Sequence, residues 1–215
     1  METNNLFIPD GFIVFVSGVP GVGKTTISYE LLRRFDKFRI IEETDLIRET
    51  LRGYNEFIKS ELGDLGNSIF NKIQITDHTK LLTFDEAKEQ CTIMKHSFEQ
   101  IIARQQRKGI PTILNGVHII PEVLNGIAQN QNVIYINLYV TNKETIYNRI
   151  VNRNPSSYML NDIPLIFQTN NDLFESTEKL IKNGNKLFNN IDVTFLKIDD
   201  TINAIKECIK GLTLK

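Results

Sequence analysis

The sequence predicts an α/β fold in which a mostly parallel, five-stranded sheet is flanked by helices. Two observations carry this prediction. Short apolar runs have the length and composition of buried strands. Segments with helical periodicity separate most of these runs, so the strands are expected to form parallel βαβ units. With 215 residues, the chain is expected to fold as a single domain over 1–215.

The elements follow from the apolar pattern and from signals at their ends. The expected strands are Phe12–Ser17, Phe38–Glu42, Thr112–Asn115, Val133–Val140 and Val193–Ile198. The expected helices are Lys24–Phe35, Asp45–Arg52, Phe84–Lys108, Lys143–Arg153, Ile163–Asn183 and Thr201–Lys210. Thr83 with Glu86, and Thr141 with Glu144, have the spacing of capping boxes. Gly109 is expected to end the long helix that Thr83 begins.

Residues 18–26 carry the clearest functional signal. Gly18–Thr25 fits G-x-x-x-x-G-K-[ST], between an expected buried strand and an expected helix. The residues expected to surround a nucleotide's phosphates are Gly18, Val19, Pro20, Gly21, Val22, Gly23, Lys24, Thr25 and Thr26. Loop amides and a helix N-terminus attract phosphate, Lys24 can reach the β- and γ-phosphates, and the Thr25 hydroxyl can bind Mg²⁺. These features predict a three-layer P-loop NTPase fold.

The segment after the second expected strand carries candidates for binding an acceptor. Asp45 is expected near the γ-phosphate, because strand carboxyl ends face the ligand crevice. There it could orient or deprotonate a hydroxyl or hold Mg²⁺ through water, or it could simply cap the following helix. Arg48 and Arg52 share a helix face with Asp45 and suit an anionic acceptor, or they could pair with Glu49 in solvent.

Further candidates lie later in the chain. Asn115 ends the third expected strand, where P-loop proteins often have an acidic ligand for metal-bound water. His118 is expected in the same crevice, where it could contact the acceptor or have only a structural role. Arg149 and Arg153 end a helix beside a polar stretch, so a lid over 149–162 could bring them onto the phosphates. They could equally stabilise the helix dipole. Residues 53–83 predict either an acceptor-binding cap or a connection that only packs.

Composition limits the partners and the setting. A net charge of −1 argues against long nucleic acid and anionic membranes as partners. Cys91 and Cys208 have no metal-binding spacing and are expected to be reduced thiols in a cytoplasmic protein. The short polar segment 1–10 is unlike a signal peptide, and no apolar run approaches membrane-spanning length. A homodimer stays open, because packing stripes for dimers and for cores look alike.

These motifs together resemble small P-loop kinases of the nucleoside-monophosphate-kinase-like group, most closely the 2-phosphoglycerate kinase type. The resemblance extends over about residues 12–185. Its matching segments are Gly18–Thr25, Thr44–Arg52, Asn115–Pro121 and Val140–Tyr158. It implies ATP, Mg²⁺ and phosphorylation of a small, hydroxylated, usually anionic acceptor. Asn115 departs from the pattern, which has a glutamate there, and an N-terminal region of the larger members has no counterpart in this sequence.

Four functions remain open at this stage. The first is a small-molecule kinase in which Lys24, Asp45, Arg149 and Arg153 act on the transferred phosphate, and in which Arg48, Arg52 and His118 hold the acceptor. A GTP-binding switch is disfavoured, because Asn142–Thr145 lacks the aspartate of N-K-x-D. A kinase of a nucleotide, sugar-nucleotide or antibiotic is the third. A weakly catalytic nucleotide-binding protein, suggested by Asn115, is the fourth.

Overall fold

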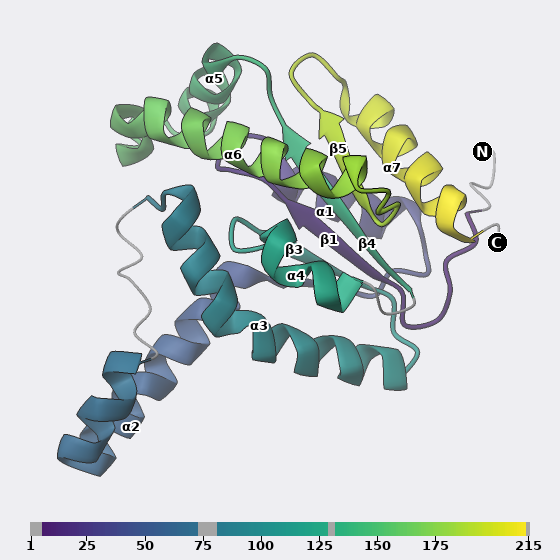
Figure 1. Ribbon diagram of the computed structural model, residues 1–215. Helices are drawn as coiled ribbons and strands as arrows, with labels where there is room; N and C mark the ends of the chain where they lie inside the picture. Colours follow the sequence, from purple (N-terminus) through teal and green to yellow (C-terminus); the bar gives the residue numbers. More distant parts are fainter. Residues whose placement is uncertain (1–5, 73–80, 129–131, 214–215) are drawn as a thin grey trace.

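The computed structural model has a sheet of five strands in the order β2-β3-β1-β4-β5 (Figure 1). The structure describes residues 6–72, 81–128 and 132–213. The strands are β1 (Ile13–Ser17), β2 (Ile40–Glu43), β3 (Thr112–Gly116), β4 (Val133–Tyr139) and β5 (Phe188–Asp192). Every neighbouring pair is parallel, which confirms the predicted α/β fold with a parallel five-stranded sheet.

Helices cover both faces of the sheet and make the predicted three layers. They are α1 (Lys24–Arg34), α2 (Thr44–Lys72), α3 (Phe84–Arg107), α4 (Pro121–Ala128), α5 (Lys143–Arg153), α6 (Ile163–Lys182) and α7 (Ile198–Thr213), with a 3-10 helix over Tyr158–Asp162. α1 and α7 pack on one face, whereas α4 and α6 pack on the other, and α3 lies beside α4 (Figure 1). No helix within the described part of the chain is long and apolar enough to cross a bilayer.

The central strands explain why the sheet has this order. All of β1 and nearly all of β4 are buried, as expected for strands covered by helices on both faces. β2 and β5 lie at the edges and are less buried. The carboxyl ends of all five strands meet at one edge of the sheet. Residues 18–23, called the phosphate loop here, follow β1 at the centre of this edge.

The fifth strand lies earlier in the chain than predicted. The sequence predicts Val193–Ile198, but β5 is Phe188–Asp192, which pairs with β4. Asparagine is unfavourable in strands, but here the Asn190 side chain accepts a hydrogen bond from Asn137 and donates one to Glu178. The apolar run is instead a loop in which Phe195 is 87% exposed, and α7 begins at Ile198 rather than at Thr201.

Two helices differ from the prediction. α2 continues to Lys72 rather than ending at Arg52, because a glycine such as Gly53 only weakens a helix. It is interrupted at Gly63, where φ is 54° and ψ is −127°, and it projects from the body of the protein (Figure 1). Residues 73–80 of the predicted cap or connection lie outside the described residues. α4 was not predicted, although Pro121 suits the first position of a helix.

One predicted capping box is present and the other is shifted. The Thr83 amide donates to Glu86 Oε2 at 2.9 Å, and the Glu86 amide donates to Thr83 Oγ1 at 3.3 Å. α5 is capped by Asn142 rather than Thr141, because Asn142 Oδ1 accepts from the Thr145 amide at 2.9 Å. The Thr141 amide instead donates to Thr194 Oγ1 at 2.8 Å, which ties the loops after β4 and β5 together.

Gly116→Ala is expected to destabilise the fold where β3 meets the start of α2. A Cβ atom at Gly116 would lie 1.7 Å from Thr44 Oγ1, so the start of α2 would have to shift. We expect a loss of about 1–3 kcal/mol in the free energy of unfolding, measured by urea denaturation. Gly211→Ala is the matched control, because a Cβ there meets nothing within 4 Å. Equal stability of both variants would contradict this account.

Candidate functional site

The phosphate loop is held against the edge of the sheet by α5. It follows β1 directly, and its glycines at 18, 21 and 23 have positive φ angles, which glycine adopts without a steric penalty. At Gly21 a Cβ atom would lie 3.2 Å from Ile146 Cγ2 and 3.3 Å from Ile150 Cγ1. The loop therefore lies directly on α5, and any larger residue at position 21 would separate the two.

Lys24 is half-buried inside the phosphate loop. Its ammonium group donates to the carbonyl oxygen of Val19 at 3.0 Å, which holds the side chain over the loop. Burial lowers the pKa of Lys24 to about 8. The charges of Asp45 and Glu43 oppose this shift, whereas Arg153 adds to it. An anion in the loop would restore the charged form, because it would replace the missing solvation.

ATP binding is expected to be coupled to proton uptake at Lys24. With a pKa of about 8, about half of the Lys24 side chains are uncharged at pH 8 in the free protein. A bound triphosphate favours the charged form, so we expect net uptake of about half a proton at pH 8 and less at pH 7. Calorimetry in buffers of different ionisation enthalpy measures this uptake. Uptake that persists unchanged in Lys24→Met would contradict the assignment to Lys24.

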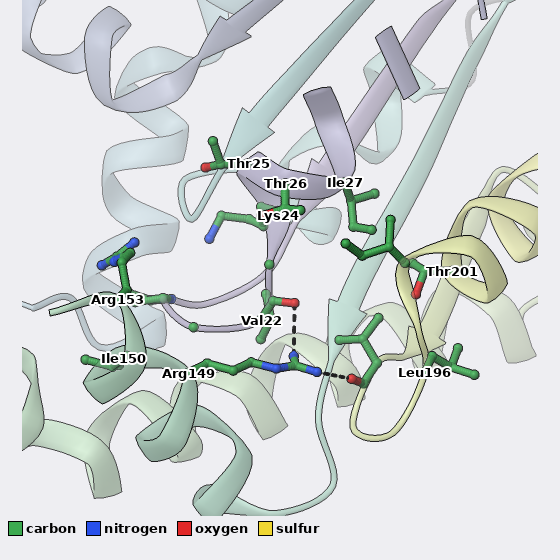
Figure 2. Close-up of a pocket in the computed structure, with 15 residues that line it drawn as sticks. Val22, Lys24, Thr25, Thr26, Ile27, Arg149, Ile150, Arg153, Leu196 and Thr201 are labelled. Atoms are coloured by element: carbon green, nitrogen blue, oxygen red, sulfur yellow. Dashed lines mark hydrogen bonds between the residues drawn. The ribbon is translucent and has the colours of Figure 1, made fainter. Parts of the chain in front are cut away.

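A cavity of about 530 Å³ opens beside the phosphate loop (Figure 2). One wall is the loop with Thr25 and Thr26, and the other is formed by α5 and by the loop that joins β5 to α7. The side chains of Ile27, Leu196 and Ile198 make part of it apolar, which suits a nucleobase. None of its described lining residues is a carboxylate, the group that reads guanine in GTP-binding switches.

Arg149 connects two walls of this cavity. Its guanidinium donates to the carbonyl oxygen of Val22 at 3.3 Å and to that of Val193 at 2.5 Å (Figure 2). It therefore fixes the phosphate loop relative to the loop after β5. Burial lowers the pKa of Arg149, and the charge of Asp192 opposes this shift. The side chain is thus engaged with the protein rather than pointing at the phosphates.

Arg153 lies one turn beyond Arg149 and has a different position. Figure 2 shows it on the same side of the phosphate loop as Lys24, whereas Arg149 reaches across to the loop before α7. Arg153 lines the cavity, and its charge contributes to lowering the pKa of Lys24. Of the two predicted arginines, Arg153 is therefore the one that lies beside Lys24.

Asp45, Arg48 and His118 meet on the other side of the phosphate loop. Asp45 Oδ1 is 3.8 Å from Arg48 Nη1 and 3.6 Å from His118 Nδ1. Asp45 is exposed over 65% of its side chain, whereas Arg48 is exposed over 11%. Two of the predicted acceptor-binding residues thus come together with the predicted orienting carboxylate.

His118 contacts Asp45 and Arg48 from the interior of the protein, and its own side chain is fully buried. Burial lowers the pKa of His118 to about 4, opposed by Asp45 and assisted by the cations Arg48 and Lys24. The ring is therefore neutral at physiological pH. A guanidinium only donates, so Nε2 accepts from Arg48 Nη1 at 3.5 Å, and Nδ1 carries the hydrogen toward Thr44 Oγ1 at 3.1 Å.

Arg52 does not join the cluster of Asp45, Arg48 and His118, whereas Glu43 lies at the site without having been predicted there. Arg52 lies one turn beyond Arg48, where its Nη1 is 3.1 Å from Glu49 Oε2, and it lines neither cavity described here. Glu43, to which the sequence reading gave no role, ends β2 in register with Asn115 of β3. Its position directly after the predicted strand Phe38–Glu42 could have indicated a site residue, because ligands bind at the carboxyl ends of parallel strands. Glu43 thus supplies a carboxylate beside the place where Asn115 lacks one.

A second, smaller cavity of about 160 Å³ lies over Asp45 and Arg48. The phosphate-loop residues Val19 and Pro20 form one wall, and Pro20 also lines the larger cavity. The two cavities therefore meet at Pro20. Tyr158 and Met159, from the predicted lid segment, form part of the opposite wall.

Proteins with similar sequences are kinases. The chain is 32% identical over 152 residues to a 2-phosphoglycerate kinase of Methanococcus vannielii, covering 66% of this chain and 47% of that protein. It is 28% identical over 179 residues to a 2-phosphoglycerate kinase of Methanococcus maripaludis, covering 77% and 56% respectively. The chain thus spans about half the length of the curated relatives it matches. No known protein-family profile matches it.

A solved structure agrees on the fold. The crystal structure of a gluconokinase from Sinorhizobium meliloti superposes with a TM-score of 0.59 at 12% sequence identity, covering 95% of this chain and 94% of that one. At this identity the likeness concerns the fold alone. The chain has the fold of the P-loop small-molecule kinases, and the curated proteins it resembles in sequence are 2-phosphoglycerate kinases.

Proposed function

We propose that the protein transfers the γ-phosphoryl group of ATP to a hydroxyl of a small anionic acceptor of the 2-phosphoglycerate type. The observation that carries this proposal is the meeting of two cavities at Pro20. The larger contains Lys24 and Arg153, whereas the smaller contains Asp45 and Arg48. A phosphate donor and a hydroxyl acceptor in these cavities would lie next to each other where both cavities are lined by Pro20, and such proximity suits phosphoryl transfer.

ATP would occupy the larger cavity. The amides of Gly18–Thr26 would surround the phosphates, and Lys24 would neutralise charge on the β- and γ-phosphates. The apolar walls around Leu196 and Ile198 would contact the base. Arg149 would act by holding Val22 and Val193 in place, and Arg153 would neutralise charge that develops during transfer.

Mg²⁺ fits the donors at this edge of the sheet. The Thr25 hydroxyl is exposed in the cavity, and Glu43 ends β2 nearby. Hydroxyl, carboxylate and phosphate oxygens are the ligands that Mg²⁺ prefers. The described residues contain no group of three or more His, Cys, Asp or Glu side chains that could hold a metal ion. When bound, Mg²⁺ would neutralise phosphate charge, with Thr25 and Glu43 holding it.

Asp45 would orient the acceptor hydroxyl and accept its proton, because its carboxylate is accessible in the smaller cavity. Arg48 would bind the anionic group of the acceptor, with His118 fixing the arginine. The segment 149–162 would serve as a lid, since it contributes Arg153 to one cavity and Met159 to the other. Leu81 and Leu82 line the smaller cavity, so the end of the 53–83 segment would help to cap the acceptor.

Weakly catalytic nucleotide binding is the second candidate, and Asn115 favours it. Asn115 is buried, and its amide nitrogen has no hydrogen-bond partner in the described part of the chain.

If Glu43 replaces the missing carboxylate, Glu43→Gln should lower turnover about tenfold or more and raise the Mg²⁺ concentration needed. Glu42→Gln is the matched control on the same strand. If catalysis is instead limited by Asn115, Asn115→Glu should raise turnover, and no change would count against weak catalysis.

The proposed function is tested by ADP release with Mg-ATP and a panel of acceptors. The panel contains 2- and 3-phosphoglycerate, glycerate, nucleosides, nucleoside monophosphates, amino sugars and hydroxy amino acids. We expect acceptor-dependent ADP release that is lost in Lys24→Ala and Asp45→Asn. Tight ATP binding with no acceptor-dependent release from any compound would overturn the proposal and favour a binding protein.

A further inference from the structure

The loop over residues 193–197 joins β5 to α7 and forms part of the wall of the larger cavity, which Val193 and Leu196 line. The middle of this loop has little packing of its own, because Phe195 is 87% exposed and Leu196 is 41% exposed. At its far end the loop continues into α7, where Ile202 and Ile205 are buried in the core. The position of this wall therefore depends on how the two ends of the loop are held.

The near end is held by hydrogen bonds of the buried residue Thr194. Its hydroxyl donates to Asp192 Oδ1 at 2.5 Å, because an ionised carboxylate only accepts. The same oxygen therefore accepts from the Thr141 amide at 2.8 Å and from the Thr141 hydroxyl at 3.1 Å. One hydroxyl thus joins the end of β5 to the residues that follow β4, with its donor and its acceptor capacity both used.

These contacts also set the direction of the Val193 carbonyl. The Thr194 amide donates to Asp192 Oδ1 at 2.8 Å, which closes a turn over residues 192–194. This amide and the Val193 carbonyl belong to one peptide group, which is planar, so fixing the amide fixes the carbonyl. The Val193 carbonyl accepts from Arg149 Nη2 at 2.5 Å. The bond between Arg149 and the loop therefore depends on the place of Thr194.

The phosphate loop has support that does not involve Thr194. Gly21 lies directly on α5, and the Lys24 ammonium group donates to the carbonyl oxygen of Val19 at 3.0 Å. A change at Thr194 should therefore move the wall that Val193 and Leu196 form, and leave most contacts of the phosphate loop in place.

We propose that Thr194 is a positioning residue for nucleotide binding, whose hydroxyl holds the loop over 193–197 where Val193 and Leu196 meet the base. The proposal rests on the proposed function for the use of the larger cavity as the nucleotide site. It does not depend on the acceptor or on phosphoryl transfer. Loss of the hydroxyl should weaken the contribution of the base to binding, and not that of the phosphates.

The test compares two ligands on the full chain by calorimetry, with Mg²⁺ present and without an acceptor. One ligand is a non-hydrolysable ATP analogue, and the other is tripolyphosphate, which has neither base nor ribose. Thr194→Val removes the hydroxyl and should weaken binding of the ATP analogue about fivefold or more, while tripolyphosphate affinity stays within about twofold. Thr194→Ser keeps the hydroxyl and should bind the ATP analogue within about twofold of wild type.

A second variant reaches the same contacts from a less buried position. Asp192→Ala removes the acceptor of both Thr194 donors, and it should also lower the affinity for the ATP analogue relative to that for tripolyphosphate. Thr177→Val is the matched control, because Thr177 is equally buried and its hydroxyl donates to the Leu173 carbonyl within α6 at 2.8 Å. Thr177 lies outside both cavities, so this variant should alter neither ligand.

The outcomes separate this proposal from the proposed function. Equal weakening of both ligands in Thr194→Val would indicate a general loss of structure and overturn the positioning role. Unchanged affinity for the ATP analogue, or a Thr194→Ser variant as weak as Thr194→Val, would overturn it too. Selective weakening of the ATP analogue in a protein that releases no ADP with any acceptor would support the role of Thr194 and overturn the kinase function alone.

Discussion

Lys24→Ala is expected to reduce phosphoryl transfer by a factor of about 10²–10³, which is typical for loss of one preorganised charge at a transition state. Lys24 is held by the Val19 carbonyl inside the loop, so its side chain is already in position before the nucleotide binds. Alanine keeps the backbone amides that bind phosphate but removes the charge. The measurement is kcat for acceptor-dependent ADP release under saturating ATP.

Lys37→Ala is the matched control for this result, because the side chain of Lys37 is 63% exposed and lies outside both cavities. It should leave kcat within about twofold. The thermal midpoint of Lys24→Ala should not fall by more than a few degrees, since a half-buried ammonium group contributes little to stability. Activity within threefold of wild type would show that Lys24 does not act on the transferred phosphate.

Asp45→Asn is expected to lower kcat by a factor of about 10²–10⁴, because the amide cannot accept a proton from the attacking hydroxyl. The affinity for ATP should change little, since Asp45 lines the smaller cavity rather than the larger one. Asparagine has nearly the same shape, so the contacts near Arg48 and His118 can be retained. The measurement is kcat together with the affinity for Mg-ATP.

Asp36→Asn, an exposed residue between α1 and β2, is the matched control and should behave as wild type. A kcat of Asp45→Asn within about threefold of wild type would assign proton transfer to another group.

Strong local signals explain why much of the fold could be predicted. β1 and β4 are continuous apolar runs because helices cover both of their faces. The capping box at Thr83 depends on neighbouring residues alone. β5 could not be found in this way, because its asparagines are satisfied by Asn137 and Glu178, which lie far away in the sequence.

The same difference between local signals and contacts of distant residues decides how much of the candidate site could be predicted. The phosphate loop is one contiguous motif, so the larger cavity could be expected from the sequence. The smaller cavity combines Arg48 with Leu82 and Met159, and no local pattern links such distant positions. The distinction between Arg149 and Arg153 also needed the structure, because both follow from the same helix spacing. Only the hydrogen bonds that Arg149 donates to the carbonyl groups of Val22 and Val193 show that its guanidinium is already bound to the protein.

Arg149 has a consequence for the order of events during turnover. It joins a carbonyl of the phosphate loop to a carbonyl beyond β5, and the same helix rests on Gly21 and carries Arg153. A rotation of α5 would therefore move Arg153, the Arg149 hydrogen bonds and the support under Gly21 together. If the nucleotide binds as proposed, withdrawal of Arg153 and departure of ADP would then be a single conformational step.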